Sequence, residues 1–160
     1  MKLKITYDGP GSQRFQRRFN AAKKVAWTQL GIYWHKALRP KHFTQRGATE
    51  YGYTARAGQR GSGKAFRRSY QGQKLKIKGH TRPLVYSGDS QKLTRLRIVR
   101  PLPKGRGVRV PLRAPALNFS PKGGRLNMAA EMTTISQPEG IILTRLFNGW
   151  ISRWLQRNSN

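Results

Sequence analysis

Hydrophobic residues recur at spacings of three and four between Ser12 and Leu38, which is the period of one helix face. Ser12 is a suitable N-cap residue, and Pro40 is expected to stop the helix near Arg39. The pattern therefore predicts a long helix over residues 12–39, with its cations mainly off the apolar stripe. The stripe consists of Phe15, Phe19, Ala22, Ala26, Leu30, Tyr33 and Ala37, widened by Trp27 and Trp34.

Shorter stretches alternate between apolar and polar residues, as half-buried strands do. They lie at residues 3–7, 74–78, 95–100 and 108–113. The last two are predicted to form an antiparallel pair joined through residues 101–107, with one apolar face and one arginine face. Residues 114–124 hold two prolines and two glycines around Leu117 and Phe119, and they predict a short edge strand followed by a turn.

The stretch from Lys74 to Asp89 combines strand-like alternation with rigid turn residues. Gly79 ends the alternation, and Pro83 restricts Arg82 to an extended conformation. The segment Ser87–Asp89 is a turn or helix-entry signal. We therefore interpret four residues as a structural anchor of the fold: Pro83, Leu84, Val85 and Gly88.

The sequence Ser136-Gln-Pro-Glu139 has the form of a capping box and predicts the start of an amphipathic C-terminal helix. Together these patterns predict one domain, 1–160, of the α+β class. A small antiparallel sheet is expected to pack with the long N-terminal helix and the C-terminal helix. The expected segments are a strand and turn at 1–11, a helix at 12–39, a flexible basic loop at 40–64, a sheet at 65–135, and a helix and tail at 136–160.

The charge balance points to a partner. Thirty-three Lys and Arg against five Asp and Glu give a net charge of +28, which a polyanion or an acidic protein surface would offset. Twenty of these cations lie in residues 39–113, which hold only two acids. Candidate polyanion-binding or partner-binding residues are Lys74, Lys76, Lys78, Arg95, Arg97, Arg100, Arg109 and Arg113.

Aromatic residues interleave with the cations at Tyr51, Tyr53, Phe66 and Tyr70. Rings among cations are typical of non-specific nucleic-acid grooves, where bases stack on them. Core or interface positions explain the same rings equally well. No helix-turn-helix or zinc-finger spacing indicates sequence-specific readout.

The candidate chemistry is sparse, and we expect neither enzyme activity nor a cofactor. Residues 58–65 miss the phosphate-binding loop pattern at Ala65, which has no hydroxyl for Mg²⁺. The five acids and the three histidines show no catalytic or metal-ligand spacing, and there is no Cys. Without an apolar run of membrane-spanning length or a signal peptide, we expect a soluble protein with no membrane contact that is intracellular where it is made.

The order of elements resembles the head-tail joining and tail-completion (neck) proteins of tailed bacteriophages. The resemblance covers residues 12–157, and its most specific motif is Pro-Leu-Val-x-Ser-Gly at 83–88. It implies an α+β fold and a virion protein whose subunits form a homo-oligomeric ring around the DNA channel, beside other neck, connector and tail proteins. In such a ring, the glycine-rich loop 47–63 and its surroundings would reach a neighbouring ring through Arg56, Arg60 and Lys64.

A ribosomal or other RNA-binding protein is the alternative, because small basic domains with Gly/Arg-rich loops are common there. The four Trp residues, two on each predicted long helix, favour burial against protein partners instead. The strongly basic strands would face either packaged DNA or acidic surfaces of adjoining rings, and both possibilities stay open.

Overall fold

The computed structural model describes residues 11–56, 58, 60–95, 98–118 and 126–158. Helices make up most of this part of the chain, and its strands form one two-stranded antiparallel sheet. This composition is compatible with the predicted α+β class and also with a mostly helical class. The predicted strand at 3–7 lies outside the described residues, as do Leu96, Arg97 and Phe119.

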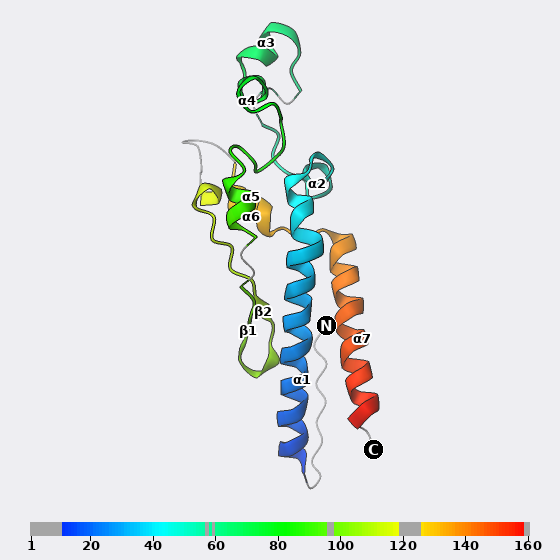
Figure 1. Ribbon diagram of the computed structural model, residues 1–160. Helices are drawn as coiled ribbons and strands as arrows, with labels where there is room; N and C mark the ends of the chain where they lie inside the picture. Colours follow the sequence, from blue (N-terminus) through cyan, green and yellow to red (C-terminus); the bar gives the residue numbers. More distant parts are fainter. Residues whose placement is uncertain (1–10, 57, 59, 96–97, 119–125, 159–160) are drawn as a thin grey trace.

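Two long helices, α1 (Ser12–Tyr33) and α7 (Gln137–Asn158), run antiparallel and side by side along the length of the molecule (Figure 1). Aromatic rings join them, with centroids 5.7 Å apart for Phe19 and Trp154 and 4.4 Å apart for Trp27 and Phe147. The amphipathic periodicity of both segments therefore builds a two-helix stalk.

The ends of α1 differ from the prediction. Gly11 occupies the N-cap position with a φ of +94°, so the N-cap role predicted for Ser12 is wrong. Beyond Tyr33 the chain continues as a π-helical turn, Trp34–Leu38, and a 3₁₀ helix, Arg39–Phe43. Pro40 lies in the first turn of the 3₁₀ helix, where its missing N–H disrupts no internal hydrogen bond. The helical path therefore runs past the expected stop.

The segment 40–64, expected to be a flexible loop, contains helix α2 (Gln45–Glu50). Thr44 caps this helix, since its Oγ1 accepts a hydrogen bond from the Gly47 N–H at 3.0 Å. A Cβ at Gly47 would lie 2.0 Å from the carbonyl oxygen of Lys41, so glycine permits the close approach. The expectation of a loop is wrong for this part of the segment.

Residues 63–78 form two short helices, α3 (Gly63–Arg68) and α4 (Tyr70–Lys78), which project beyond the end of α1 (Figure 1). The predicted strand at 74–78 is therefore wrong. Ser69 caps α4 by accepting from the Gly72 N–H, and Gly79 ends it in the left-handed conformation. Leu75 and Ile77 are 43% and 62% exposed, so their alternation marks no buried sheet face.

The predicted antiparallel pair is present but short, and the rest of the sheet expected over 65–135 is absent from the described residues. Strands β1 (Arg100–Pro101) and β2 (Val108–Arg109) are joined through a 3₁₀ turn, Pro103–Gly105. This hairpin packs on α1, while α7 lies on the other side of α1 (Figure 1). Of the two long helices, α1 is the one that covers the hairpin.

The hydrophobic core lies where α1 gives way to the shorter helices. Helix α5 (Asp89–Leu93), a 3₁₀ turn (Pro115–Asn118) and α6 (Met128–Thr133) surround it (Figure 1). The 3₁₀ turn replaces the edge strand expected there, since Leu117 N–H bonds back to the carbonyl of Ala114. The core residues are Phe43, Leu84, Val85, Ala114, Leu117 and Met132.

Candidate polyanion-binding hairpin

The β1–β2 hairpin places two arginines directly opposite each other. Arg100 pairs with Arg109, and Pro101 pairs with Val108. Both arginines are exposed and share one face of the ladder, since paired residues of an antiparallel ladder point to the same side. Their Cβ atoms are therefore roughly 5 Å apart.

The opposite face of the hairpin is apolar and packs against Gly31 of α1. A Cβ at Gly31 would lie 2.9 Å from Cγ1 of Val99, 3.0 Å from Cγ2 of Val108 and 3.3 Å from Cγ2 of Val110. The absence of a side chain at Gly31 thus allows the valines to reach the helix backbone. The division into an apolar and an arginine face, predicted from the alternation, is present in the hairpin.

The tip of the hairpin is tied to α1 as well. The indole Nε1 of Trp27 donates to the Gly105 carbonyl at 3.0 Å, and the Leu102 N–H donates to the Gly107 carbonyl at 2.8 Å. Gly105 has a φ of +62°, and a Cβ there would lie 2.8 Å from Cβ of Lys23. These contacts hold the hairpin as a rigid element on the stalk.

No described carboxylate neutralises the hairpin. The two ion pairs found in the described part of the chain, Lys41–Glu139 and Arg56–Glu131, lie beyond the C-terminal end of α1 and involve no hairpin residue. Glu50 lies there too, where it accepts from the Ser136 hydroxyl at 3.1 Å. The hairpin cations Arg100, Lys104, Arg106 and Arg109 are all exposed.

The other predicted cations do not extend the arginine face. Lys74 is buried, and its Nζ donates to the carbonyl of Arg82. Burial, and then the positive charge of Arg56, lower the pKa of Lys74 to about 8. Lys76 and Lys78 are exposed on α4, away from the hairpin (Figure 1). Because residues 70–78 form α4 rather than a strand, these candidate cations lie apart from Arg100 and Arg109.

The remaining site residues are scattered. Arg95 and Arg113 are exposed, and Arg97 lies outside the described residues. Arg60 is exposed ahead of α3, and Lys64 is exposed in its first turn. Arg56 instead donates to both carboxylate oxygens of Glu131, at 2.9 and 2.6 Å. Its side chain therefore stabilises the fold of its own subunit.

The anchor stretch contributes to the core rather than to the binding surface. Leu84 and Val85 are 3% and 4% exposed, and Pro83 beside them is buried. Leu84 takes a φ of +53°, which is uncommon for a residue with a side chain. Gly88 takes a φ of +89° and precedes the first residue of α5. The chain therefore turns sharply on both sides of Val85.

A buried polar cluster of His42, Tyr51 and Tyr53 was not predicted from the sequence. His42 stacks on Tyr51 with ring centroids 4.0 Å apart, and its Nδ1 hydrogen-bonds with the Tyr53 hydroxyl at 2.5 Å. Burial lowers the pKa of His42 to about 4 and raises the pKa of both tyrosines. Tyr51 is therefore buried and Tyr53 is partly buried against the core, so the core alternative holds for these two rings.

The other two interleaved aromatic residues lie on the projecting helices. Tyr70 is 47% exposed, and Phe66 is half-buried. Three of the five acids, Glu50, Glu131 and Glu139, converge on the polar cluster. The one local signal for this convergence was the capping box, in which Oε2 of Glu139 accepts from the Ser136 N–H at 3.3 Å.

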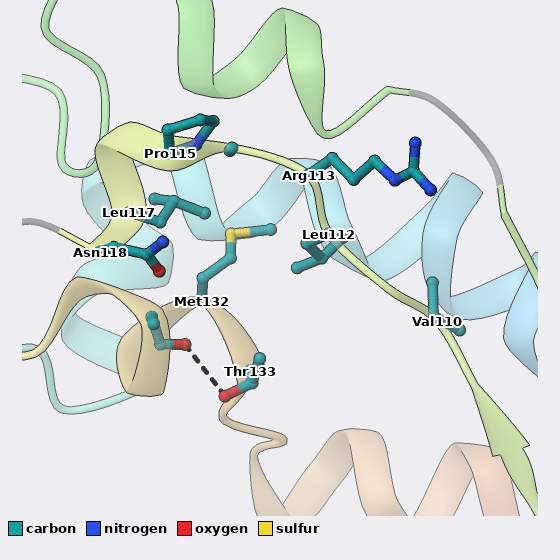
Figure 2. Close-up of a pocket in the computed structure, with 10 residues that line it drawn as sticks. Val110, Leu112, Arg113, Pro115, Leu117, Asn118, Met132 and Thr133 are labelled. Atoms are coloured by element: carbon teal, nitrogen blue, oxygen red, sulfur yellow. Dashed lines mark hydrogen bonds between the residues drawn. The ribbon is translucent and has the colours of Figure 1, made fainter.

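A pocket of about 410 Å³ lies between the segment 110–118 and α6 (Figure 2). Leu112, Leu117 and Met132 form its apolar wall, and Thr133 bonds to the carbonyl of Ala129 at 3.0 Å. Arg113 is its one titratable lining residue. Among the residues that the structure places, no group of three His, Asp or Glu side chains is arranged to hold a metal ion.

The geometry defines a mostly helical, strongly basic protein with an arginine-paired hairpin on a two-helix stalk. Comparison with family models, with curated proteins and with solved structures found no match to this chain. None of the helices in the described ranges is long and apolar enough to cross a membrane.

Proposed function

We propose that this protein is a structural virion subunit of a tailed bacteriophage. It forms a homo-oligomeric ring in the neck and joins the head connector to the tail around the DNA channel. Its role is structural rather than catalytic, and its partners are copies of itself and the adjoining neck, connector and tail proteins. The sequence resemblance to neck proteins suggests this assignment, and the exposed apolar surface of α7 supports it.

Helix α7 leaves part of its apolar surface uncovered, since seven of its nine large apolar side chains are half-buried and two are exposed. Glu139 is its one buried residue, although the helix carries nine large apolar side chains between Ile141 and Leu155. Ile141 and Ile142 are 47% and 37% exposed. At 3.6 residues per turn they lie roughly 120° and 140° around the helix from Phe147, which contacts α1.

An apolar helix face turned away from its own subunit is typical of a surface that a second protein covers. A second copy of the chain is the occupant that a ring requires, because each subunit then buries one face against an identical neighbour. The projecting helix α4 supplies two further exposed apolar side chains, Leu75 and Ile77, for contacts along the axis. Arg60 and Lys64 lie in the same projection.

The assembly state of nuclease-treated protein tests the proposal. Light scattering in about 1 M salt, where the Debye length is about 3 Å, measures the native mass without charge-driven clustering, and negative-stain imaging shows its shape. We expect closed rings. The double variant Ile141→Ser/Ile142→Ser should reduce the mass to that of the subunit. Val25→Ser is the matched control, since Val25 is 61% exposed on α1 and should leave the rings intact.

Equal loss of rings in both variants would argue against α7 as the subunit interface. A salt-stable monomer that binds RNA tightly, with affinity falling steeply as salt rises, would replace this proposal by the RNA-binding alternative.

A further inference from the structure

We propose that Arg100 and Arg109 form a clamp for the phosphodiester backbone of a nucleic acid, with Lys104 and Arg106 adding charge at the hairpin tip. The clamp consists of the two arginines that the β1–β2 register places opposite each other. Phosphate binding by this hairpin does not require ring assembly, so either property can be absent without the other.

The free hairpin carries an unfavourable pair of like charges. Cationic side chains directly opposite each other on two strands destabilise the ladder. The ladder spans two residue pairs, and Arg100–Arg109 is one of them. A phosphate between the two guanidinium groups removes this repulsion, because each arginine donates to its oxygens in a fork geometry. The register therefore favours the state in which an anion is bound.

The hairpin is also held in place before any ligand binds. Val99, Val108 and Val110 meet α1 at Gly31, and Trp27 bonds to the carbonyl of Gly105. Lys104 adopts a φ of +55°, a left-handed conformation that lysine seldom takes. Such conformations persist where surrounding contacts hold them, and they concentrate at functional sites.

The surface around the clamp favours a nucleic acid over an acidic protein. Protein interfaces are enriched in aromatic and other large apolar residues at their centres. The described hairpin residues 98–109 include none of the exposed large hydrophobic residues, which lie on α1, α4, α5, α7 and adjoining turns. The outward residues are cations and prolines, as expected for contacts to a phosphate backbone. A two-stranded ribbon also fits the major groove of duplex DNA.

Salt-dependent binding to a labelled random-sequence DNA duplex tests the clamp on the full chain. Each phosphate that the protein neutralises contributes about −0.9 to the slope of log K against log salt for duplex DNA. Because the two arginines share one phosphate, the variant Arg100→Gln/Arg109→Gln should reduce the magnitude of this slope by about 0.9. The matched control, Arg67→Gln/Arg68→Gln, removes the same charge from exposed positions on α3 and should leave the slope within about 0.5 of the parent value.

Equal reduction of the slope by both variants would overturn the clamp, because the effect would then follow net charge alone. An unchanged slope in the hairpin variant would overturn it as well. A single-stranded RNA of the same length separates the two sources of phosphate. For the hairpin variant, the clamp predicts a smaller slope of log K against log salt with both probes, by about 0.7 per phosphate for the single strand. Tighter binding of the parent protein to the duplex would identify DNA as the preferred ligand.

Thermal unfolding of the unbound protein gives a second readout. Replacing one arginine removes the like-charge repulsion, so Arg109→Gln should raise Tm by about 1–4 °C in low salt. The gain should vanish in about 1 M salt, where the repulsion is screened in the parent protein as well. A variant that binds duplex more weakly yet unfolds at a higher temperature is the expected signature, and a lower Tm in low salt would contradict it.

Discussion

The hydroxyl of Tyr51 donates a 2.5 Å hydrogen bond to Oε1 of Glu139, although 88 residues separate the two in the chain. Tyr51 follows the last residue of α2, and Glu139 lies in the first turn of α7. The Glu139 carboxylate is 1% exposed and also accepts from the Ser136 N–H, with Lys41 Nζ at 3.9 Å. This bond therefore fixes where the stalk helix α7 leaves the body of the protein.

Replacing Tyr51 by Phe should lower the free energy of unfolding by about 1.5–3 kcal/mol, because the buried carboxylate of Glu139 loses a charge-assisted hydrogen bond. Urea denaturation followed by circular dichroism measures the change. Tyr86→Phe removes a hydroxyl from a residue that is 49% exposed, and it should stay within about 0.5 kcal/mol of the parent. Equal effects of the two substitutions would show that the Tyr51–Glu139 bond contributes little.

The Arg56–Glu131 pair should also be important for stability. Both side chains are about nine-tenths buried, with relative exposures of 11% and 9%. Arg56→Met leaves the Glu131 charge without its bidentate partner, which costs about 3 kcal/mol for a buried pair. Arg60→Met, at an exposed position nearby, is the control and should change stability by less than about 0.5 kcal/mol. A double-mutant cycle with Glu131→Gln isolates the pairwise energy, and a coupling near zero would contradict its role.

Stability should fall on mild acidification because of His42. Its pKa is about 4 in the folded protein, mainly through burial, against about 6.5 when unfolded. The unfolded state therefore binds more protons between these values, and folding free energy is lost as the pH falls from about 6.5 to 4, by at most about 3 kcal/mol. His42→Gln should flatten this dependence in urea titrations at several pH values. An unchanged slope would assign the effect to other groups, such as His80, whose pKa burial also lowers.

Two glycine-to-alanine substitutions should change the free energy of unfolding in opposite directions. At Gly31 the added Cβ would lie within 3.0 Å of two valine side chains, and overpacking of about 1–3 kcal/mol exceeds the helix-propensity gain of nearly 1 kcal/mol. At Gly149 in α7 nothing lies within 4 Å of the added Cβ, so Gly149→Ala should stabilise the helix by about 1 kcal/mol. Thermal unfolding of both variants checks the prediction. Stabilisation by Gly31→Ala would show that the hairpin does not pack tightly on α1.

Local sequence was sufficient to predict the helices and the hairpin faces, because their patterns are repeated along the segment. The stripe from Phe15 to Ala37 specifies a helix over several turns, and the Ser136–Glu139 capping box places the start of α7 within one residue. The valines of the hairpin alternate with Arg100 and Arg109, which was enough to predict one apolar and one cationic face. In each case the signal depends on neighbours within a few residues along the chain.

Tertiary structure decided the remainder. Five alternating residues at 74–78 fit a strand as well as a helix. No strand in the described part of the chain pairs with them, and they form α4 between the cap at Ser69 and the left-handed Gly79. The burial of Lys74 and the meeting of Glu139 with Tyr51 join residues that lie far apart in sequence or depend on how elements pack. Periodicity reports which side of an element is apolar, but only packing determines which element covers that side, and therefore which charges remain exposed to a partner.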